Sequence, residues 1–144
     1  MKIVVPDASV LLRWVVPTTE EGRDSALQLR EAAAAGEIAL MVPPLWLYEV
    51  GNTLARRFPD QAGQLLEVLV AFGLIEKGAT DPWRRQALKL TRDYGVTFYD
   101  AAYHALALVE SGVFVTADSE YVRKTQAAGA VSLLGAHTGQ QPGT

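Results

Sequence analysis

Short apolar runs alternate along the chain with longer segments in which apolar and polar residues recur at helical spacing. The runs, rich in β-branched residues, predict buried strands, and the segments between them predict helices. The predicted strands are residues 3–5, 38–42, 74–75, 113–116 and 130–134. The predicted helices are residues 8–14, 21–35, about 45–57, 60 to about 73, 81–94, 98–111 and 118–128. This alternation is typical of βα units and of a mainly parallel sheet with helices on both faces.

Several of these boundaries coincide with residues that start or stop helices. Thr18 and Glu21 have the spacing of a capping box, in which two side chains satisfy free backbone N–H groups of the first turn. Asp81 followed by Pro82 predicts an N-cap and a proline at the first helical position. Glycines follow four of the predicted helices, at positions 36, 95, 112 and 129.

The size of the chain predicts one domain with an ordinary hydrophobic core. It has 144 residues, of which 49% are hydrophobic and 20% are charged. We expect the domain to cover 1–135 and the polar residues 136–144 to form a flexible tail. Asp7 and Arg13 interrupt the N-terminal apolar stretch, and no apolar run approaches the ~20 residues of a membrane-spanning helix. We therefore expect a soluble, cytoplasmic protein that does not enter a membrane.

Charge and cysteine content limit the partners and the kinds of active site that the protein can have. The 13 basic and 16 acidic residues leave a net charge of -3, so the chain lacks the basic field of a typical nucleic-acid-binding protein. Contact with a nucleic acid would need a local basic patch or bound cations. The chain has no cysteine, which excludes disulfides, thiolate zinc sites and cysteine nucleophiles.

Four acidic residues stand at positions where they can converge. Asp7 and Asp118 each directly follow a predicted strand, and parallel strands bring such residues to one edge of the sheet. Glu49 and Asp100 lie in unusually apolar helical segments, where a carboxylate needs a cation or strong hydrogen-bond donors. Clustered carboxylates are typical ligands of a hard divalent cation such as Mg²⁺ or Mn²⁺. These ions commonly assist phosphodiester hydrolysis.

Each acid also has a purely structural interpretation. Asp7 and Asp118 both precede helices and could serve only as N-caps. Asp100 could be the fourth residue of a capping box that begins at Thr97, and Glu49 could pair with Arg56. The joint metal site is our hypothesis because two of the acids follow strands that end at one edge of the sheet and the other two lie in apolar helices.

At these residues the chain resembles the PIN-domain family, and within it the VapC-type toxins of toxin–antitoxin pairs. The resemblance extends from Lys2 to about Leu134. Its four motifs are VVPDASVL at 4–11, YEVGNTL at 48–54, YDAAYHALA at 99–107 and VTADS at 115–119. No motif is specific by itself, but their order and spacing together are. The resemblance implies a three-layer α/β/α sandwich with a mainly parallel central sheet.

The resemblance also implies a function, a ligand set and partners. The function is an endoribonuclease that uses Mg²⁺ or Mn²⁺ and leaves a 5′-phosphate and a 3′-hydroxyl. Asp7, Asp100 and Asp118 would be the main metal ligands, and Glu49 would bind directly or through water. Ser9 and Thr116 would support these ligands. The implied partners are an RNA substrate, a cognate antitoxin protein and a second copy in a homodimer. The alternative is a catalytically silent PIN-like module that binds RNA or protein.

A few other residues have open interpretations. Arg13 could contact phosphate or cover apolar surface, and Arg123 with Lys124 is the basic pair that we expect to contact RNA. His104 lies one turn after Asp100, where it could act on the metal or, more simply, be a buried polar residue. The tryptophans at 14, 46 and 83 are candidates for core or interface anchors, and Trp46 with Leu47 could form a dimer or antitoxin surface.

Overall fold

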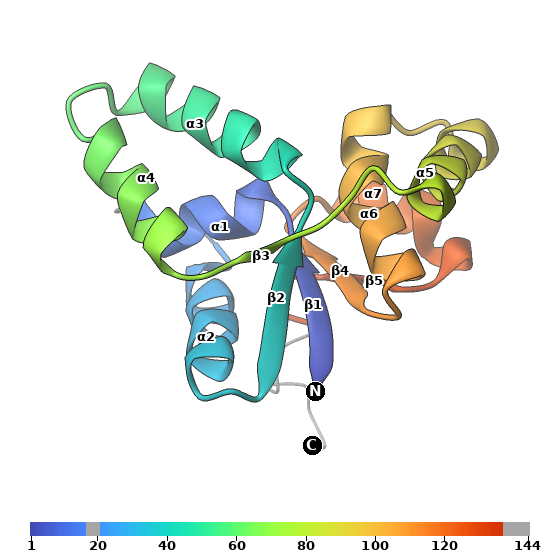
Figure 1. Cartoon of the computed structure of the whole chain (residues 1–144), viewed down its shortest axis with the longest axis horizontal. Coiled ribbons are helices and arrows are strands. Elements are labelled where there is room, and N and C mark those ends of the chain that lie inside the picture. The colour runs from blue at the N-terminus through green and yellow to red at the C-terminus, as the bar shows by residue number, and fades with distance from the viewer. Residues whose placement is uncertain (17–20, 137–144) are drawn as a thin grey trace.

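The computed structural model contains one five-stranded parallel sheet in the order β3-β2-β1-β4-β5 (Figure 1). The structure describes residues 1–16 and 21–136. The strands are β1 (Lys2–Pro6), β2 (Ile38–Val42), β3 (Ile75–Glu76), β4 (Val113–Thr116) and β5 (Val131–Leu133). The predicted fold class is confirmed, and every strand pairing is parallel.

Helices cover both faces of this sheet. They are α1 (Ala8–Val15), α2 (Arg23–Ala34), α3 (Leu45–Arg57), α4 (Ala62–Ala71), α5 (Asp81–Tyr94), α6 (Phe98–Val109) and α7 (Ser119–Thr125), followed by a 3₁₀ turn (Gln126–Ala128). Helices α1 and α2 pack on one side of the sheet, and α3 and α4 contact α1. Helices α5, α6 and α7 lie on the other side (Figure 1). The architecture is therefore the expected α/β/α sandwich.

The central strand β1 is covered on both faces. Val4 lies between Leu40 of β2 and Val113 of β4, and both Val4 and Val5 are fully buried. A strand with helices above and below it has no solvent-facing side, which explains why its sequence shows a continuous apolar run. Because β1 and β4 are parallel neighbours, the residues that follow them emerge side by side.

The three tryptophans anchor the core, and each satisfies its indole N–H. The Nε1 groups of Trp14 and Trp83 donate to the carbonyls of Ala26 and Ala102, at 2.7 and 3.0 Å. Trp46 is 3% exposed and donates to the Glu76 carboxylate at 2.7 Å, which ties α3 to β3. The proposed surface role of Trp46 is therefore wrong, since its ring lies in the core.

Some helix starts differ from the predicted ones. Helix α2 begins at Arg23 after Gly22, whose positive φ of 90° suits glycine, so Glu21 lies before the helix. The other half of that predicted capping box, Thr18, lies outside the described residues. Helix α5 is capped by Thr80, whose hydroxyl accepts from the Trp83 N–H, so Asp81 is the first helical residue and Pro82 the second.

Other boundaries differ by one or two residues. Helix α4 begins at Ala62, after a turn in which the Gln61 N–H donates to Phe58. Helix α6 ends at Val109 because Ser111 adopts a positive φ of 58°.

Within 1–16 and 21–136, no helix has both the length and the hydropathy to cross a membrane. Most of the predicted tail, residues 137–144, lies outside the described residues.

Gly112 provides a test of the packing between β1 and the start of β4. A Cβ atom there would lie 2.7 Å from the Ile3 carbonyl oxygen and 2.8 Å from Ile3 Cγ2. We expect Gly112→Ala to destabilise the protein by about 1–3 kcal/mol, because backbone must shift to relieve the clash. Gly51→Ala is the matched control, since its Cβ meets nothing within 4 Å. Removing a helical glycine there should stabilise by about 0.5–1 kcal/mol. Urea denaturation measures both changes, and equal stabilities would contradict this packing.

Candidate active site

Asp7 is the first residue after β1 and the N-cap of α1. Its backbone N–H donates to Val115 of β4, and its Oδ1 atom accepts from the Val10 N–H at 3.2 Å. The structural interpretation of Asp7 as a cap is therefore correct as far as it goes. The bond to Val10 uses only part of one carboxylate oxygen, which leaves capacity for further contacts.

Two hydroxyl groups hold the Asp7 carboxylate from both sides. Ser9 donates to Oδ1 at 2.5 Å, and Thr116, the last residue of β4, donates to Oδ2 at 2.6 Å. The Ser9 oxygen also accepts from the Ala117 N–H at 3.2 Å. These bonds join the ends of β1 and β4 and restrict the carboxylate to one orientation. The structure thus places both predicted supporting residues against Asp7.

Asp118 lies in the loop that links β4 to α7, next to this pair of strand ends. Its N–H donates to the Thr116 hydroxyl at 3.1 Å, and its Oδ1 accepts from the Tyr121 N–H at 3.1 Å as the N-cap of α7. Thr116 therefore contacts both acids. The Asp118 side chain is exposed, so its second oxygen faces solvent.

Glu49 and Asp100 approach from the helices α3 and α6. The Tyr103 hydroxyl donates to Glu49 Oε1 at 2.6 Å and so links the two helices. Among the described residues, Glu49 has no ion pair with Arg56, so that structural alternative is wrong. Thr97 caps α6 by accepting from the Asp100 N–H at 3.1 Å, as the capping pattern predicted.

The four acids lie within range of one another's charge. Burial raises the pKa of Asp7, and the bonds from Ser9 and Thr116 offset part of that rise. Burial also raises the pKa of Glu49, and the charges of Asp7 and Asp100 raise it further. Partial burial of the carboxyl group raises the pKa of Asp100, with a contribution from Asp118. Charge repulsion therefore couples Glu49 to Asp7 and Asp100, and Asp100 to Asp118.

The acids do not yet surround a single point. Within residues 1–16 and 21–136, no three histidine, aspartate or glutamate side chains lie close enough to enclose a metal ion. Hydroxyl or backbone donors hold Asp7, Glu49 and Asp118 where they are. The ligand atoms of these acids are all oxygen, which matches Mg²⁺ or Mn²⁺ and not a softer metal.

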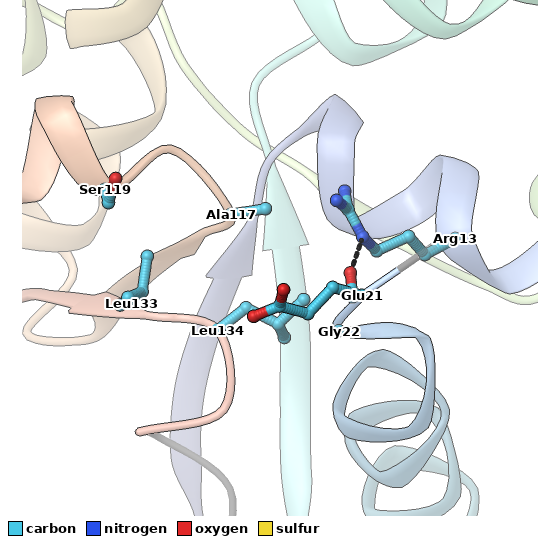
Figure 2. A pocket seen from close by; sticks show the side chains of 7 residues that line it. All are labelled: Arg13, Glu21, Gly22, Ala117, Ser119, Leu133 and Leu134. Atoms are coloured by element: carbon cyan, nitrogen blue, oxygen red, sulfur yellow. Dashed lines mark hydrogen bonds between the residues drawn. The ribbon is translucent and has the colours of Figure 1, made fainter. Parts of the chain in front are cut away.

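A pocket of about 330 Å³ lies between α1, the segment before α2, the loop after β4 and the end of β5 (Figure 2). Its walls are Arg13, Glu21, Gly22, Ala117, Ser119, Leu133 and Leu134. Arg13 donates from Nη1 to the Ser9 carbonyl at 2.8 Å and from Nε to the Glu21 carbonyl at 3.0 Å. The predicted RNA contact at Arg13 therefore lies beside the acids, where it also connects α1 to the segment before α2.

Arg123 and Lys124 lie farther along α7, on its exposed surface. Arg123 forms an ion pair with Glu120 at 3.0 Å, which neutralises much of its charge. The predicted RNA contact there remains untested, and the ion pair weakens the case for it.

His104 is fully buried, and both of its ring nitrogens have hydrogen-bond partners. Its Nε2 lies 2.7 Å from the Gly129 carbonyl, which can only accept, so Nε2 carries the proton. Its Nδ1 then accepts from the Tyr121 hydroxyl at 2.9 Å. Burial lowers the pKa of His104 and favours this neutral form. Both nitrogens are thus used, and the structural interpretation of His104 is the correct one.

Tyr103 is the site residue that the sequence did not single out. Its position one turn after Asp100 was a usable signal, because residues at that spacing share a helix face. What the sequence could not show is that this face meets Glu49, which lies 54 positions earlier in the chain.

The chain is similar to known proteins over most of its length. The family model of the PIN domain matches residues 4–126. Ribonuclease VapC3 of Pyrobaculum aerophilum is 36% identical over 131 residues, which cover 86% of this chain and 95% of that protein.

Solved structures with low sequence identity share the fold. VapC20 of Mycobacterium tuberculosis, a sarcin–ricin loop cleaving toxin, has a TM-score of 0.64 at 16% identity and covers 89% of this chain and 96% of its own. A chain of a toxin–antitoxin complex from Klebsiella pneumoniae has a TM-score of 0.66 at 12% identity, with coverage of 90% and 95%.

The buried carboxylate of Asp7 makes stability depend on pH. Since the folded pKa lies above the ordinary 3.8, the contribution of Asp7 to stability is complete below that value and is lost as pH rises through the folded pKa. Asp7→Asn removes this loss. In metal-free buffer, the unfolding free energy of the variant relative to wild type should therefore increase as pH rises above 3.8.

Denaturation curves at several pH values measure this difference and cancel the opposite contribution of His104, which both proteins share. Asp24→Asn, on the exposed surface of α2, is the control. If the unfolding free energies of Asp7→Asn and wild type differed by the same amount at every pH, the pKa of Asp7 would not be raised in the folded protein.

Proposed function

The chain belongs to the PIN-domain family, and from this premise we propose that it is a divalent-metal-dependent endoribonuclease, the toxin of a toxin–antitoxin pair. The observation that carries the proposal is geometric: Thr116 hydrogen-bonds both Asp7 and Asp118, and Tyr103 of α6, three residues after Asp100, hydrogen-bonds Glu49 of α3. Carboxylates that approach one another in this way repel, and a bound cation would relieve that repulsion. The similarity to Ribonuclease VapC3 extends over most of both chains and supports RNA as the substrate.

In this proposal each residue has a separate task. Asp7, Asp100 and Asp118 would hold Mg²⁺ or Mn²⁺, and Glu49 would bind directly or through water. Such an ion would supply Lewis-acid chemistry to the scissile phosphate and the attacking water, and hydrolysis would leave a 5′-phosphate and a 3′-hydroxyl. Ser9 and Thr116 orient Asp7 through their hydroxyl bonds, and Tyr103 orients Glu49.

An antitoxin protein would silence the enzyme by covering this site. The toxin–antitoxin complex among the structural relatives supports that part of the proposal. We also propose a homodimer that acts in the cytoplasm. Exposed apolar side chains on α4, Val68 and Val70, provide surface for a protein partner.

Cleavage of a pool of structured RNAs tests the proposal directly. Purified protein should cut the pool with Mn²⁺ or Mg²⁺ and stop when a chelator is added. Asp100→Asn should lose at least about 100-fold in rate, because a metal ligand and its charge are removed together. Discrete internal cuts, read from product lengths, identify an endonuclease, whereas stepwise shortening from one end identifies an exonuclease.

Calorimetric titration with Mn²⁺ separates the alternatives. Metal binding without cutting, for several RNA classes, would reject ribonuclease activity on those RNAs. A folded protein that neither binds metal nor cuts RNA would support the silent binding module.

Tyr103→Phe tests how Glu49 is held. The variant keeps the buried ring, which stacks on Phe114, and removes only the hydroxyl that donates to Glu49. We expect cleavage or metal affinity to fall by roughly 10- to 100-fold, as for other groups that orient metal ligands. Tyr94→Phe is a conservative control away from the acids. Wild-type cleavage by Tyr103→Phe would mean that Glu49 needs no orienting bond.

A further inference from the structure

The exposed face of α3 carries a row of residues suited to a nucleic-acid strand. Tyr48, Asn52 and Arg56 follow one another at intervals of four residues and are all exposed, with Tyr48 at 73%. Asn52 and Arg56 also lie three and seven residues after Glu49, so the row continues the face that carries this acid. Helix α3 leads from the strand ends toward the outer edge of the molecule (Figure 1).

The end of this row carries two adjacent arginines that have no acidic partner among the described residues. Arg84 and Arg85 both pair with Asp81, and Arg123 pairs with Glu120. Within the described part of the chain, Arg56 and Arg57 form the adjacent basic pair in which neither member has a carboxylate partner. A chain with a net charge of -3 and four clustered acids needs such unneutralised cations to attract a polyanion.

The exposed tyrosine provides a second, independent contact. Tyr48 directly precedes Glu49, and Tyr99, 65% exposed, directly precedes Asp100. The bond between Tyr103 and Glu49 holds these two helix segments together, so an exposed ring stands next to each acid. Aromatic rings of this kind stack on unpaired bases whatever the sequence, whereas bases in a duplex are already stacked.

We propose that the row Tyr48–Asn52–Arg56, called here the α3 track, binds an unpaired RNA strand next to the cleaved bond. Tyr48 stacks on a base, Asn52 offers its amide to the sugar or base, and Arg56 binds a phosphate. The α3 track would make the enzyme select single-stranded loops or ends over duplex. This inference rests on the proposed ribonuclease function.

Fluorescence anisotropy tests the α3 track without cleavage. The parent is the full chain with Asp100→Asn, and the probe is a fluorescein-labelled unstructured oligoribonucleotide of about 12 nucleotides, within the range for single-strand sites. Tyr48→Ala should weaken binding by roughly 5- to 150-fold, and Tyr48→Phe should restore it. Arg56→Ala should weaken binding and reduce the slope of log affinity against log salt by about 0.7.

Two controls isolate the geometry from the charge. Arg57→Ala removes the same charge from the neighbouring position, which turns to a different face and lies over the Phe58 ring. Lys89→Ala removes an exposed charge from α5. Neither should change the affinity as much as Arg56→Ala. A duplex of the same composition should bind more weakly than the single strand, with no loss on Tyr48→Ala.

The outcomes separate this inference from the proposed function. Suppose that wild-type protein cuts the RNA pool, that Tyr48→Ala and Arg56→Ala bind the probe like the Asp100→Asn parent, and that the same two changes in the wild-type background leave cutting unaltered. The α3 track is then wrong and the nuclease stands. If the pool is not cut but the probe binds through Tyr48 and Arg56, the α3 track stands without the nuclease. If the two variants change only self-association in sedimentation, the row is a protein interface and the inference is overturned.

Discussion

The attachment of Asp7 to the end of β4 is the interaction on which the proposed site depends. Thr116 donates to one oxygen of Asp7 and accepts from the N–H of Asp118, so one hydroxyl sets the positions of two acids. It can do so because β1 and β4 are adjacent parallel strands that end at the same edge. Loss of that pairing would separate Asp7 from Asp118, whatever the remaining side chains did.

Helix capping and the proposed metal binding would use the same carboxylates, and the two interpretations do not compete. Asp7 and Asp118 each cap a helix with Oδ1, and Asp7 is held at its second oxygen as well. A cap fixes where the residue lies and how it is oriented, which is what a metal ligand requires. The cost is a buried charge whose pKa is raised, and a bound cation would remove that cost.

The acidic balance of the chain is compatible with an RNA substrate once charge is considered locally. Most arginines on α5 and α7 have acidic neighbours, so their fields are short-ranged. The cations at the end of α3 lack such neighbours. A bound divalent ion would further reduce the negative potential among the four acids. The electrostatic potential near the RNA would therefore depend on where the cationic side chains lie and on the bound ion. The net charge of the chain would have little effect on it.

The sequence by itself determined the elements and the identity of the four acids. Its apolar periodicity located β2 and β4 to the residue, and placement after strands singled out Asp7 and Asp118. Local patterns decide these features because strand and helix periods are properties of neighbouring residues. Only the tertiary structure decided that Tyr103 holds Glu49, that His104 binds Tyr121 and Gly129, and that Trp46 lies in the core. Those contacts join residues far apart in the chain. Packing between helices and strands determines which of their faces meet, and the local periodicity of the sequence carries no information on that packing.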